Sequence, residues 1–398
     1  MNALDWFIVL AYMLGMIALS VYLSRGQENQ ADYYVGGRNL PWWAIGLSTM
    51  ATQSSAISFI SIPAFVALKP GGGLRILQNE FVLPLSMIFI MVLLMPYFRK
   101  LQLISIYEYL EVRFSPTTRT LLASLFLFSR GLATGFGLYA IALVLSVAMQ
   151  VDPAITCILL GVVTLIYDSI GGMKAVVYSD VLQMIILLGG IGLTSVYAVN
   201  MAGGLTLTLQ SLNPEQMQGV DFAHAGLGDG NEYNFWAMVI GGFFLYASYY
   251  GCDQTQAQRQ LSAPNLADTR RSLIFNGYFR FPLVLLYAVM GVSVGAALAS
   301  SSEFQALMQP YMESKRYDYM LPVFIMNYLP HGVRALILSA ILAAAMSSLD
   351  SALNSLSACT MRDFYERHFP DSGNPKRYLL WSKLTTVAWG LAVTLSAV

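Results

Sequence analysis

Long apolar segments recur along almost the whole chain, each close to the roughly 20 residues that a helix needs to cross a bilayer. Short polar connections separate them. This pattern predicts an all-α polytopic membrane protein that forms a single transmembrane domain over residues 1–398. The predicted membrane segments are 5–24, 42–67, 79–98, 120–149, 154–170, 177–200, 235–257, 273–299, 334–359 and 378–398.

The composition agrees with a chain that lies in lipid. Hydrophobic residues make up 56% of the sequence and charged residues 11%, whereas soluble domains carry about a quarter charged residues. The net charge is zero and like charges do not cluster, so nothing favours nucleic acid as a partner. Three cysteines lack metal-ligand spacing, and no HExxH, CxxC or P-loop motif occurs. We therefore predict a transporter and not an enzyme, with no catalytic or cofactor-binding residues.

Basic residues in the connections predict the orientation. If the N-terminus lies outside, the cytoplasmic connections hold most of the lysines and arginines, as the positive-inside rule requires. These residues are Arg25, Arg38, Arg99, Lys100, Arg113, Arg119, Lys174, Arg259, Arg270, Arg271, Arg362, Arg367, Lys376 and Arg377. The external segments then hold only Lys69, Arg75, Lys315, Arg316 and Arg334. We expect a multi-pass protein of the cell inner (plasma) membrane with its N-terminus outside.

Two membrane segments carry polar or glycine-rich interruptions at mid-membrane depth. Segment 42–67 contains Thr52, Gln53, Ser54, Ser55 and Ser58 within an apolar run. Segment 235–257 contains Gly241, Gly242 and Gly251 around Tyr246 and Tyr249. Unwound backbone at such positions supplies carbonyl groups to a ligand, as in secondary transporters built from inverted repeats. The alternative is that the hydroxyls bond to their own helices and the glycines allow close packing.

A polar stripe follows segment 334–359, because helical spacing places Ser347, Asp350, Ser351 and Asn354 on one face. Sodium prefers oxygen ligands, and Ser347 and Ser348 supply hydroxyls. An acidic residue within the membrane, such as Asp350, is costly and indicates a functional role. Interhelical hydrogen bonding is the alternative for the serines, and pairing with a neighbouring helix is the alternative for Asp350.

Four sequence stretches together resemble the sodium/solute symporter family, which includes sodium/glucose and sialic acid cotransporters. They are ADYYVGGRNLPWW, YDSIGGMKAVVYSDVLQ, DQTQAQRQLSA and MSSLDSALNS. The resemblance implies a LeuT-like fold of inverted five-helix repeats, with an extra N-terminal helix at 5–24. The first repeat is expected at 42–200 and the second at 235–398. The family pattern has a further core helix after residue 398, so the sequence is expected to be C-terminally incomplete.

The resemblance also implies where sodium binds. One site is expected from backbone carbonyls and hydroxyls at Ala51, Ser54, Ala344, Ser347 and Ser348. A second sodium of the sialic acid branch matches Asp180, Ser347, Asp350 and Ser351, although that branch has serine where this chain has Asp350. The extra carboxylate leaves open whether Asp350 binds sodium, a proton or a basic side chain, and how many sodium ions are carried.

The same resemblance implies substrate contacts. Glu80 matches a glutamate of sugar carriers, Arg280 stands where sugar and sialic acid carriers have lysine, and Tyr249 matches their inner-side tyrosine. The full expected set is Gln53, Ser55, Ser58, Glu80, Tyr246, Tyr249 and Arg280. Ser58 replaces a glutamine that contacts sugar in some family members, which weakens galactose-type recognition. The arginine of sialic acid carriers aligns with Thr134, while this chain has Arg130 one turn earlier.

The resulting hypothesis is a sodium-coupled symporter that imports a small polar organic solute by alternating access. A sugar or a sugar-derived polyol or acid is the first choice of solute. Monocarboxylates, amino acids or vitamins are the alternatives within the family. A sodium and solute sensor of the same fold, without transport, is the alternative from another class. We expect Na⁺ as the co-transported ion, the lipid bilayer as surroundings and a monomeric protein.

Overall fold

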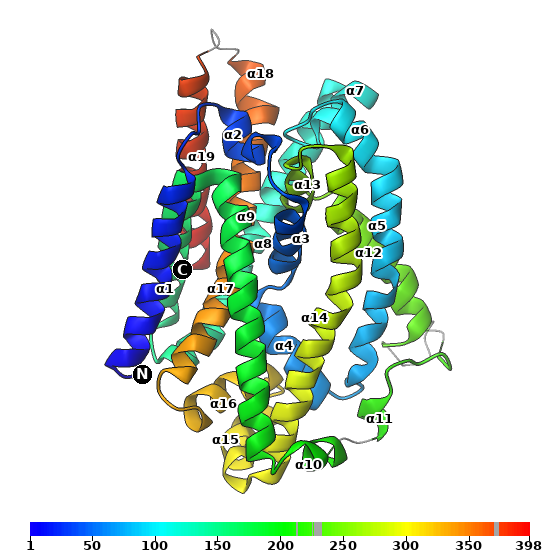
Figure 1. Ribbon diagram of the computed structural model, residues 1–398, viewed down its shortest axis with the longest axis vertical. Helices are drawn as coiled ribbons and strands as arrows, with labels where there is room; N and C mark the ends of the chain where they lie inside the picture. The colour runs from blue at the N-terminus through cyan, green and yellow to red at the C-terminus, as the bar shows by residue number, and fades with distance from the viewer. Residues whose placement is uncertain (212–213, 225, 227–232, 370–373) are drawn as a thin grey trace.

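The computed structural model describes residues 1–211, 214–224, 226, 233–369 and 374–398, and the regular elements among them are helical. Long helices run side by side along the long axis, and short helices join them at both ends (Figure 1). The longer helices are α1 (Ala3–Leu23), α3 (Trp42–Gln53), α4 (Ala56–Ala67), α8 (Pro116–Met149), α9 (Pro153–Met201), α12 (Phe235–Gly251), α14 (Leu266–Ser300), α15 (Ser302–Glu313), α17 (Val333–Cys359) and α19 (Pro375–Ala397).

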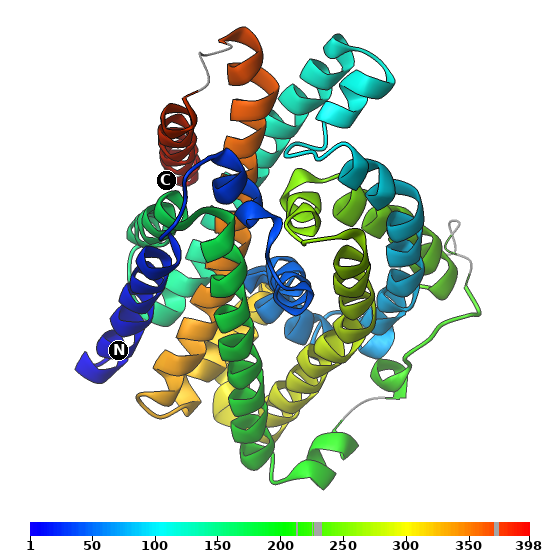
Figure 2. The same ribbon diagram turned by 45° about the horizontal axis from the view of Figure 1, so that its top comes forward.

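The shorter helices lie mainly at the two ends of the bundle (Figures 1 and 2). They are α2 (Gln30–Val35), α5 (Leu83–Phe89), α6 (Met95–Lys100), α7 (Glu108–Arg113), α10 (Leu205–Gln210), α11 (Pro214–Met217), α13 (Gln254–Leu261), α16 (Met320–Tyr328) and α18 (Glu366–His368). Short 3₁₀ segments at Gly36–Arg38, Leu74–Val82 and Tyr317–Tyr319, and π-helical segments at Ile90–Leu94 and Thr360–Tyr365, complete the described elements.

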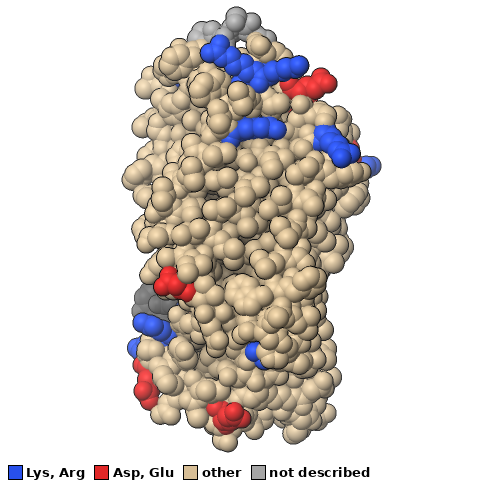
Figure 3. Space-filling view, turned by 90° about the vertical axis from the view of Figure 1, so that its left-hand side faces the viewer, with Lys and Arg blue, Asp and Glu red and all other residues tan. Residues whose placement is uncertain are grey.

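Six helices within the described residues are long and apolar enough to cross a membrane, or up to eight when each of two bent pairs counts as one span. The bent pairs are α3 with α4 and α12 with α13, which are the two segments where the sequence predicts interruptions. Helix α19 forms where the last membrane segment is predicted, but Lys383 and polar residues make it less apolar than those spans. A broad band without charged side chains crosses the face shown in Figure 3.

Helix α9 contains a break that explains its length. A straight helix of 49 residues would be about 73 Å long, far more than a bilayer is thick. At Gly172 the backbone turns with φ of 57°, and a Cβ there would lie 2.5 Å from the carbonyl oxygen of Tyr33. Glycine is therefore required, and the chain reverses so that the two predicted segments 154–170 and 177–200 form separate arms (Figure 1).

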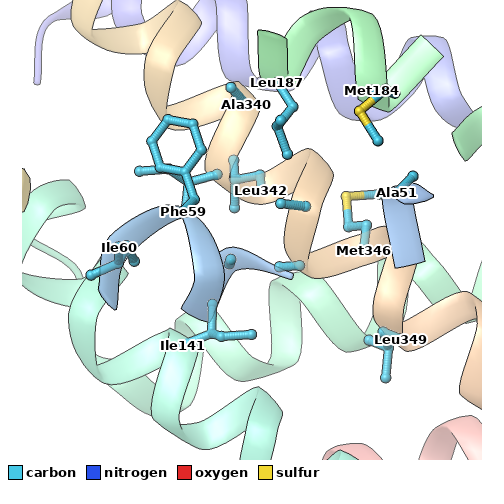
Figure 4. Close-up of a cluster of buried hydrophobic side chains, with 14 of the residues drawn as sticks. Ala51, Phe59, Ile60, Ile141, Met184, Leu187, Ala340, Leu342, Met346 and Leu349 are labelled. Atoms are coloured by element: carbon cyan, nitrogen blue, oxygen red, sulfur yellow. The ribbon is translucent and has the colours of Figure 1, made fainter. Parts of the chain in front are cut away.

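Helix α17 forms the centre of the bundle, and almost all of its residues are buried. It crosses the break between α3 and α4, where Ala51 and Met346 lie side by side (Figure 4). Its N-terminal end is tied to α1, because Asp5 accepts a hydrogen bond from the Gly332 N–H at 2.8 Å. A buried helix with this many serines and an aspartate must satisfy them internally, and the side chains that do so define the candidate site.

Candidate ion and solute site

The first helix break lies at Ser54 and Ser55, where α3 and α4 meet at a bend of 61°. Ser54 has φ of −85° and ψ of 61°, outside the helical region, and Ser55 starts α4 by capping the Ser58 N–H. The last carbonyl groups of α3 therefore lack the partners that a continuous helix would give them. They face α17 in the interior, as expected for a broken transporter helix.

Hydroxyl groups of α17 meet these carbonyls. The Ser347 hydroxyl donates to the Ala51 carbonyl at 3.1 Å, and the Ser348 hydroxyl donates to the Thr52 carbonyl at 3.0 Å. Ser348 also lies 3.4 Å from the carbonyl oxygen of Ala344, one turn earlier on α17. The Ser54 N–H contacts the Ala51 carbonyl at 3.0 Å. The structure thus brings together Ala51, Ser54, Ala344, Ser347 and Ser348.

The chemistry of this group suits a hard monovalent cation. Its polar atoms are carbonyl and hydroxyl oxygens, which sodium prefers. Among the described residues, no group of three or more histidine, cysteine, aspartate or glutamate side chains is placed to hold a metal ion. Where such a cation binds, it replaces the hydrogen bonds that now join Ser347 and Ser348 to the end of α3.

A second, charged cluster lies next to these serines. Asp180 of α9 accepts from Ser48 of α3 at 2.6 Å, and Arg259 of α13 lies 3.1 Å from the same carboxylate oxygen. The Arg259 guanidinium also contacts the Ser351 hydroxyl, while Asp350 accepts from Tyr167 at 2.6 Å. Asp180, Asp350 and Arg259 are all fully buried. The residues expected at a second sodium site, Asp180, Ser347, Asp350 and Ser351, therefore lie together with a guanidinium among them.

The position of Arg259 was not expected from the sequence, which placed it in a cytoplasmic connection. All residues of α13 are buried, although QTQAQRQL is strongly polar. Its side chains bond to several neighbouring elements: Gln254 to the Ile104 carbonyl at 2.7 Å, Gln258 to Asn354 at 2.8 Å and Gln260 to Thr49 at 2.9 Å. The sequence signal that could have identified this buried polar helix is the series of glutamines, with one arginine among them, directly after an apolar segment.

A cavity of about 250 Å³ adjoins the candidate ion site. Its walls come from the α3–α4 break, α8, α17 and the region of the second break. Three of the expected substrate residues, Gln53, Ser55 and Tyr249, line it. Ser348 lines it as well, so one hydroxyl belongs both to the cavity wall and to the candidate ion site. An ion and a solute placed here would be near neighbours.

The second helix break, between α12 and α13, lies at the same cavity and carries charge. The two helices meet at a bend of 58°, and Asp253 caps α13 by accepting from the Thr255 N–H at 2.8 Å. The carboxylate also forms an ion pair with Arg130 of α8. Sequence reasoning noted Arg130 but missed this pair, because its members are far apart in the chain.

The other expected substrate residues lie outside the cavity lining, and three of them form a buried group. Glu80 accepts from the Tyr246 hydroxyl at 2.9 Å and lies 3.8 Å from Arg280 Nε. Arg280 in turn donates to the Ser54 hydroxyl at 2.6 Å. Ser58, also expected to contact substrate, lies on the first turn of α4 with its hydroxyl 3.5 Å from the Gln53 carbonyl. These residues reach the first helix break and not the cavity wall.

Comparison with known proteins agrees with the fold. The model of the sodium:solute symporter family matches residues 33–398. The sodium/sialic acid symporter SiaT of Proteus mirabilis is 29% identical over 402 residues, covering 99% of this chain and 78% of that protein. NanT of Aliivibrio fischeri, also a sodium/sialic acid symporter, is 30% identical over 396 residues, covering 99% of this chain and 76% of the relative. A sodium/glucose cotransporter of Vibrio parahaemolyticus is 26% identical over 413 residues, covering 94% of this chain and 71% of that protein.

A solved structure extends the agreement to three dimensions. It is the substrate-bound outward-open state of a Na⁺-coupled sialic acid symporter, described as revealing a novel Na⁺ site. It superposes with a TM-score of 0.85 at 26% identity and covers 100% of this chain and 82% of that one. The all-helical, LeuT-like architecture expected from the sequence is confirmed. The chain belongs to the sodium:solute symporter family of multi-span membrane transporters, which couple solute movement to sodium.

Proposed function

We propose that this protein imports a small organic acid, in the first place a sugar-derived acid, together with sodium by alternating access. The observation that carries the proposal is the cavity beside Ser348, which is lined both by this proposed ion ligand and by several proposed solute-binding groups. Gln53, Ser55 and Tyr249 supply amide and hydroxyl groups suited to sugar hydroxyls. The similarity to two sodium/sialic acid symporters supports an acidic sugar over a neutral one.

Sodium at Ala51, Ser54, Ala344, Ser347 and Ser348 couples the two movements. The ion would join the end of α3 to α17 and hold the first break in one arrangement. Because Ser348 also lines the cavity, sodium binding would fix the wall that the solute contacts. A bound ion or solute shifts a conformational equilibrium only by its differential affinity for the two states. A side chain such as Ser348, which belongs to both the proposed ion site and the cavity wall, gives that difference.

We further propose that a second sodium binds between Asp180, Ser347, Asp350 and Ser351. Asp180 and Asp350 are fully buried, and Arg259 is the guanidinium that contacts this cluster. One oxygen of Asp180 has no hydrogen-bond partner among the described residues. Buried carboxylates without enough positive charge are costly, so an added cation would balance the cluster.

Glu80, Tyr246 and Arg280 have a different part in this proposal. Their buried group is connected to the first break through the bond from Arg280 to Ser54. We assign them the positioning of Ser54 at the first break. A solute that enters deeper would meet them next, as the sequence hypothesis expects.

We place the end that carries α2, α7, α13 and α18 in the cytoplasm, with the N-terminus outside and the protein in the cell inner membrane as a monomer. Arg38, Arg362 and Arg367 lie at this end, as the positive-inside rule favours. The two repeats, 42–200 and 235–398, would rock against each other around the cavity, with α1 outside both.

The test is uptake of labelled solutes into proteoliposomes under an imposed inward sodium gradient. The solutes are sugar acids, neutral sugars and monocarboxylates. Accumulation of a sugar acid that stops when the sodium gradient is collapsed supports the proposal. Uptake that is equal with sodium and with potassium would contradict it, and binding without uptake would favour the sensor hypothesis.

A further inference from the structure

The Arg130–Asp253 ion pair stands between two hollows of the protein. Arg130 lines the cavity beside Ser348, whereas Asp253 lines a second groove of about 570 Å³. Tyr249 lines both. The lining of the groove also includes Tyr107 and Leu110, at the end of the molecule that we place in the cytoplasm. The ion pair and Tyr249 thus form a partition between the cavity and a groove toward the inner side.

Arg130 is the charged member of the cavity wall. Among the described residues that line this cavity, it alone carries a formal charge, and the others are polar neutral or apolar. Its side chain retains 25% of its accessible surface and that of Asp253 retains 18%, so neither is sealed from the hollows. A guanidinium in this position can form paired hydrogen bonds with a carboxylate, whichever molecule supplies it.

Asp253 can lose its ion pair with Arg130 and still cap helix α13. One carboxylate oxygen caps α13 through the Thr255 N–H at 2.8 Å and accepts from the Thr255 hydroxyl at 2.6 Å. The other oxygen is the one paired with Arg130. The N-terminus of a helix stabilises a carboxylate by itself, so Asp253 remains accommodated when the guanidinium turns away.

We propose that Arg130 binds the carboxylate of the transported solute and that Asp253 occupies this guanidinium until the solute arrives. The inference rests on the proposed uptake of an organic acid and names the residue that recognises it. One carboxylate replaces another as the partner of Arg130, so the guanidinium is paired both before and after the exchange. A neutral solute cannot make the exchange, and the cavity therefore selects acids.

The exchange also connects solute binding to the inner side. When Arg130 turns to the solute, the partition loses the contact between α8 and the second helix break. Asp253 stays on α13, whose other side chains bind α3 and α17. Binding of the acid thereby favours states in which α13 and α8 separate and the cavity joins the groove.

The experiment compares acids with their neutral counterparts in the full chain, purified in detergent. The probes are N-acetylneuraminate with N-acetylmannosamine, and D-glucuronate with D-glucose, titrated calorimetrically in sodium buffer. We expect wild type to bind the acid of at least one pair and to discriminate against its neutral counterpart. Arg130→Gln should weaken acid binding by about 10- to 100-fold, as expected for losing a charge-assisted contact.

Two further variants make the outcome specific. Asp253→Asn removes the competing carboxylate and should strengthen acid binding by about 3- to 10-fold. Arg130→Lys keeps the charge without the paired geometry and should fall between wild type and Arg130→Gln. Arg271→Gln, which alters an exposed pair with Asp268 at the end of α14, is the matched control and should bind as wild type does.

Several results would overturn the inference. Equal acid affinity in wild type and Arg130→Gln would remove the arginine from the solute site. Weaker acid binding in Asp253→Asn would show that the aspartate supports the solute and does not compete with it. This second arm remains decisive if Arg130→Gln fails to fold. Sodium-driven uptake of only the neutral counterparts would contradict this inference while leaving sodium coupling intact, whereas no sodium-driven uptake of any probe would contradict the proposed function too.

Discussion

The two broken helices have similar geometry and different chemistry. The α3–α4 pair bends by 61° and the α12–α13 pair by 58°, and both breaks lie beside the same cavity. At the first break the groups that face α17 are carbonyl and hydroxyl oxygens, and Ser54 and Ser55 carry no charge. At the second break Asp253 begins α13 and pairs with Arg130.

This difference shows how the same kind of helix break can bind two different ligands, a cation and an anion. Neutral oxygens at the end of a half-helix suit a cation, because the helix dipole places partial negative charge there. A charged pair at the other break suits recognition of an anion, because one partner can be exchanged. In our proposals the first break holds sodium and the second recognises the solute, with Ser348 and Tyr249 in the shared cavity wall.

The largest expected effect comes from removing Arg259, which connects the second broken helix to the first. Arg259 of α13 donates to Ser48 of α3 at 2.7 Å and pairs with Asp180 at 3.1 Å, all buried. Removing one partner of a buried pair costs about 3–5 kcal/mol. Arg259→Gln should therefore greatly lower the thermal unfolding midpoint in detergent. The double variant Asp180→Asn with Arg259→Gln should recover part of the loss, and an unchanged midpoint in the single variant would show that the breaks are not joined here.

The next prediction tests whether sodium binds at the first break. Ser348→Ala removes a hydroxyl ligand of the proposed sodium site, and the sodium concentration for half-maximal uptake should rise about 10-fold. Ser355→Ala, on the same buried helix but with its hydroxyl donating to the Ala352 carbonyl of its own helix, is the matched control and should leave it unchanged. A sodium dependence in Ser348→Ala that equals wild type would remove this serine from the site.

Asp350→Asn tests whether the ion side binds more than one sodium. The proposed second site needs this carboxylate to balance the cluster around Arg259. The variant should lower the number of sodium ions moved per solute from two to one, measured from the reversal potential in proteoliposomes. Tyr167, which donates to Asp350 at 2.6 Å, can still bond to the amide oxygen, so the fold should persist. The same ratio in variant and wild type would rule out Asp350 as a ligand of a coupled ion.

A smaller effect concerns the support of the second break. Gln254 of α13 bonds to the Ile104 carbonyl and the Ile106 N–H, and Glu108 holds the same segment through the Ile104 and Ser105 N–H groups. Burial raises the pKa of Glu108, but Arg362 and these backbone donors outweigh it and hold that pKa below its ordinary value.

The stabilisation from Glu108 is therefore present above the unfolded-state pKa, about 4.3, and is lost as pH falls through the lower folded-state pKa. Glu108→Gln should lower the unfolding midpoint slightly at pH 7, and the gap to wild type should close in acid. Thermal unfolding from pH 7 to pH 3 measures this. A gap that stays constant with pH would mean that the ionised form of Glu108 adds nothing to stability.

The helices and the two broken segments could be predicted from sequence, while the charged partnerships could not. Serines within an apolar run identify a break locally, and helical spacing alone brings Ser347 to the face of Asp350 and Ser351. Arg130 and Asp253 meet only because α8 packs beside the second break, a long-range contact that no local pattern encodes. Arg259 was assigned to a loop for a related reason: polar residues after an apolar segment resemble a solvated connection, but here several of these side chains bond to neighbouring buried elements.

The most direct test of sodium coupling at the first break is solute-driven sodium movement. Proteoliposomes with wild type or Ser348→Ala receive radioactive sodium at a concentration well below saturation, with and without a sugar acid that wild type transports. We predict that the acid stimulates sodium entry through wild type and that Ser348→Ala loses most of this stimulation while Ser355→Ala keeps it. Solute uptake through wild type without any accompanying sodium entry would contradict the account.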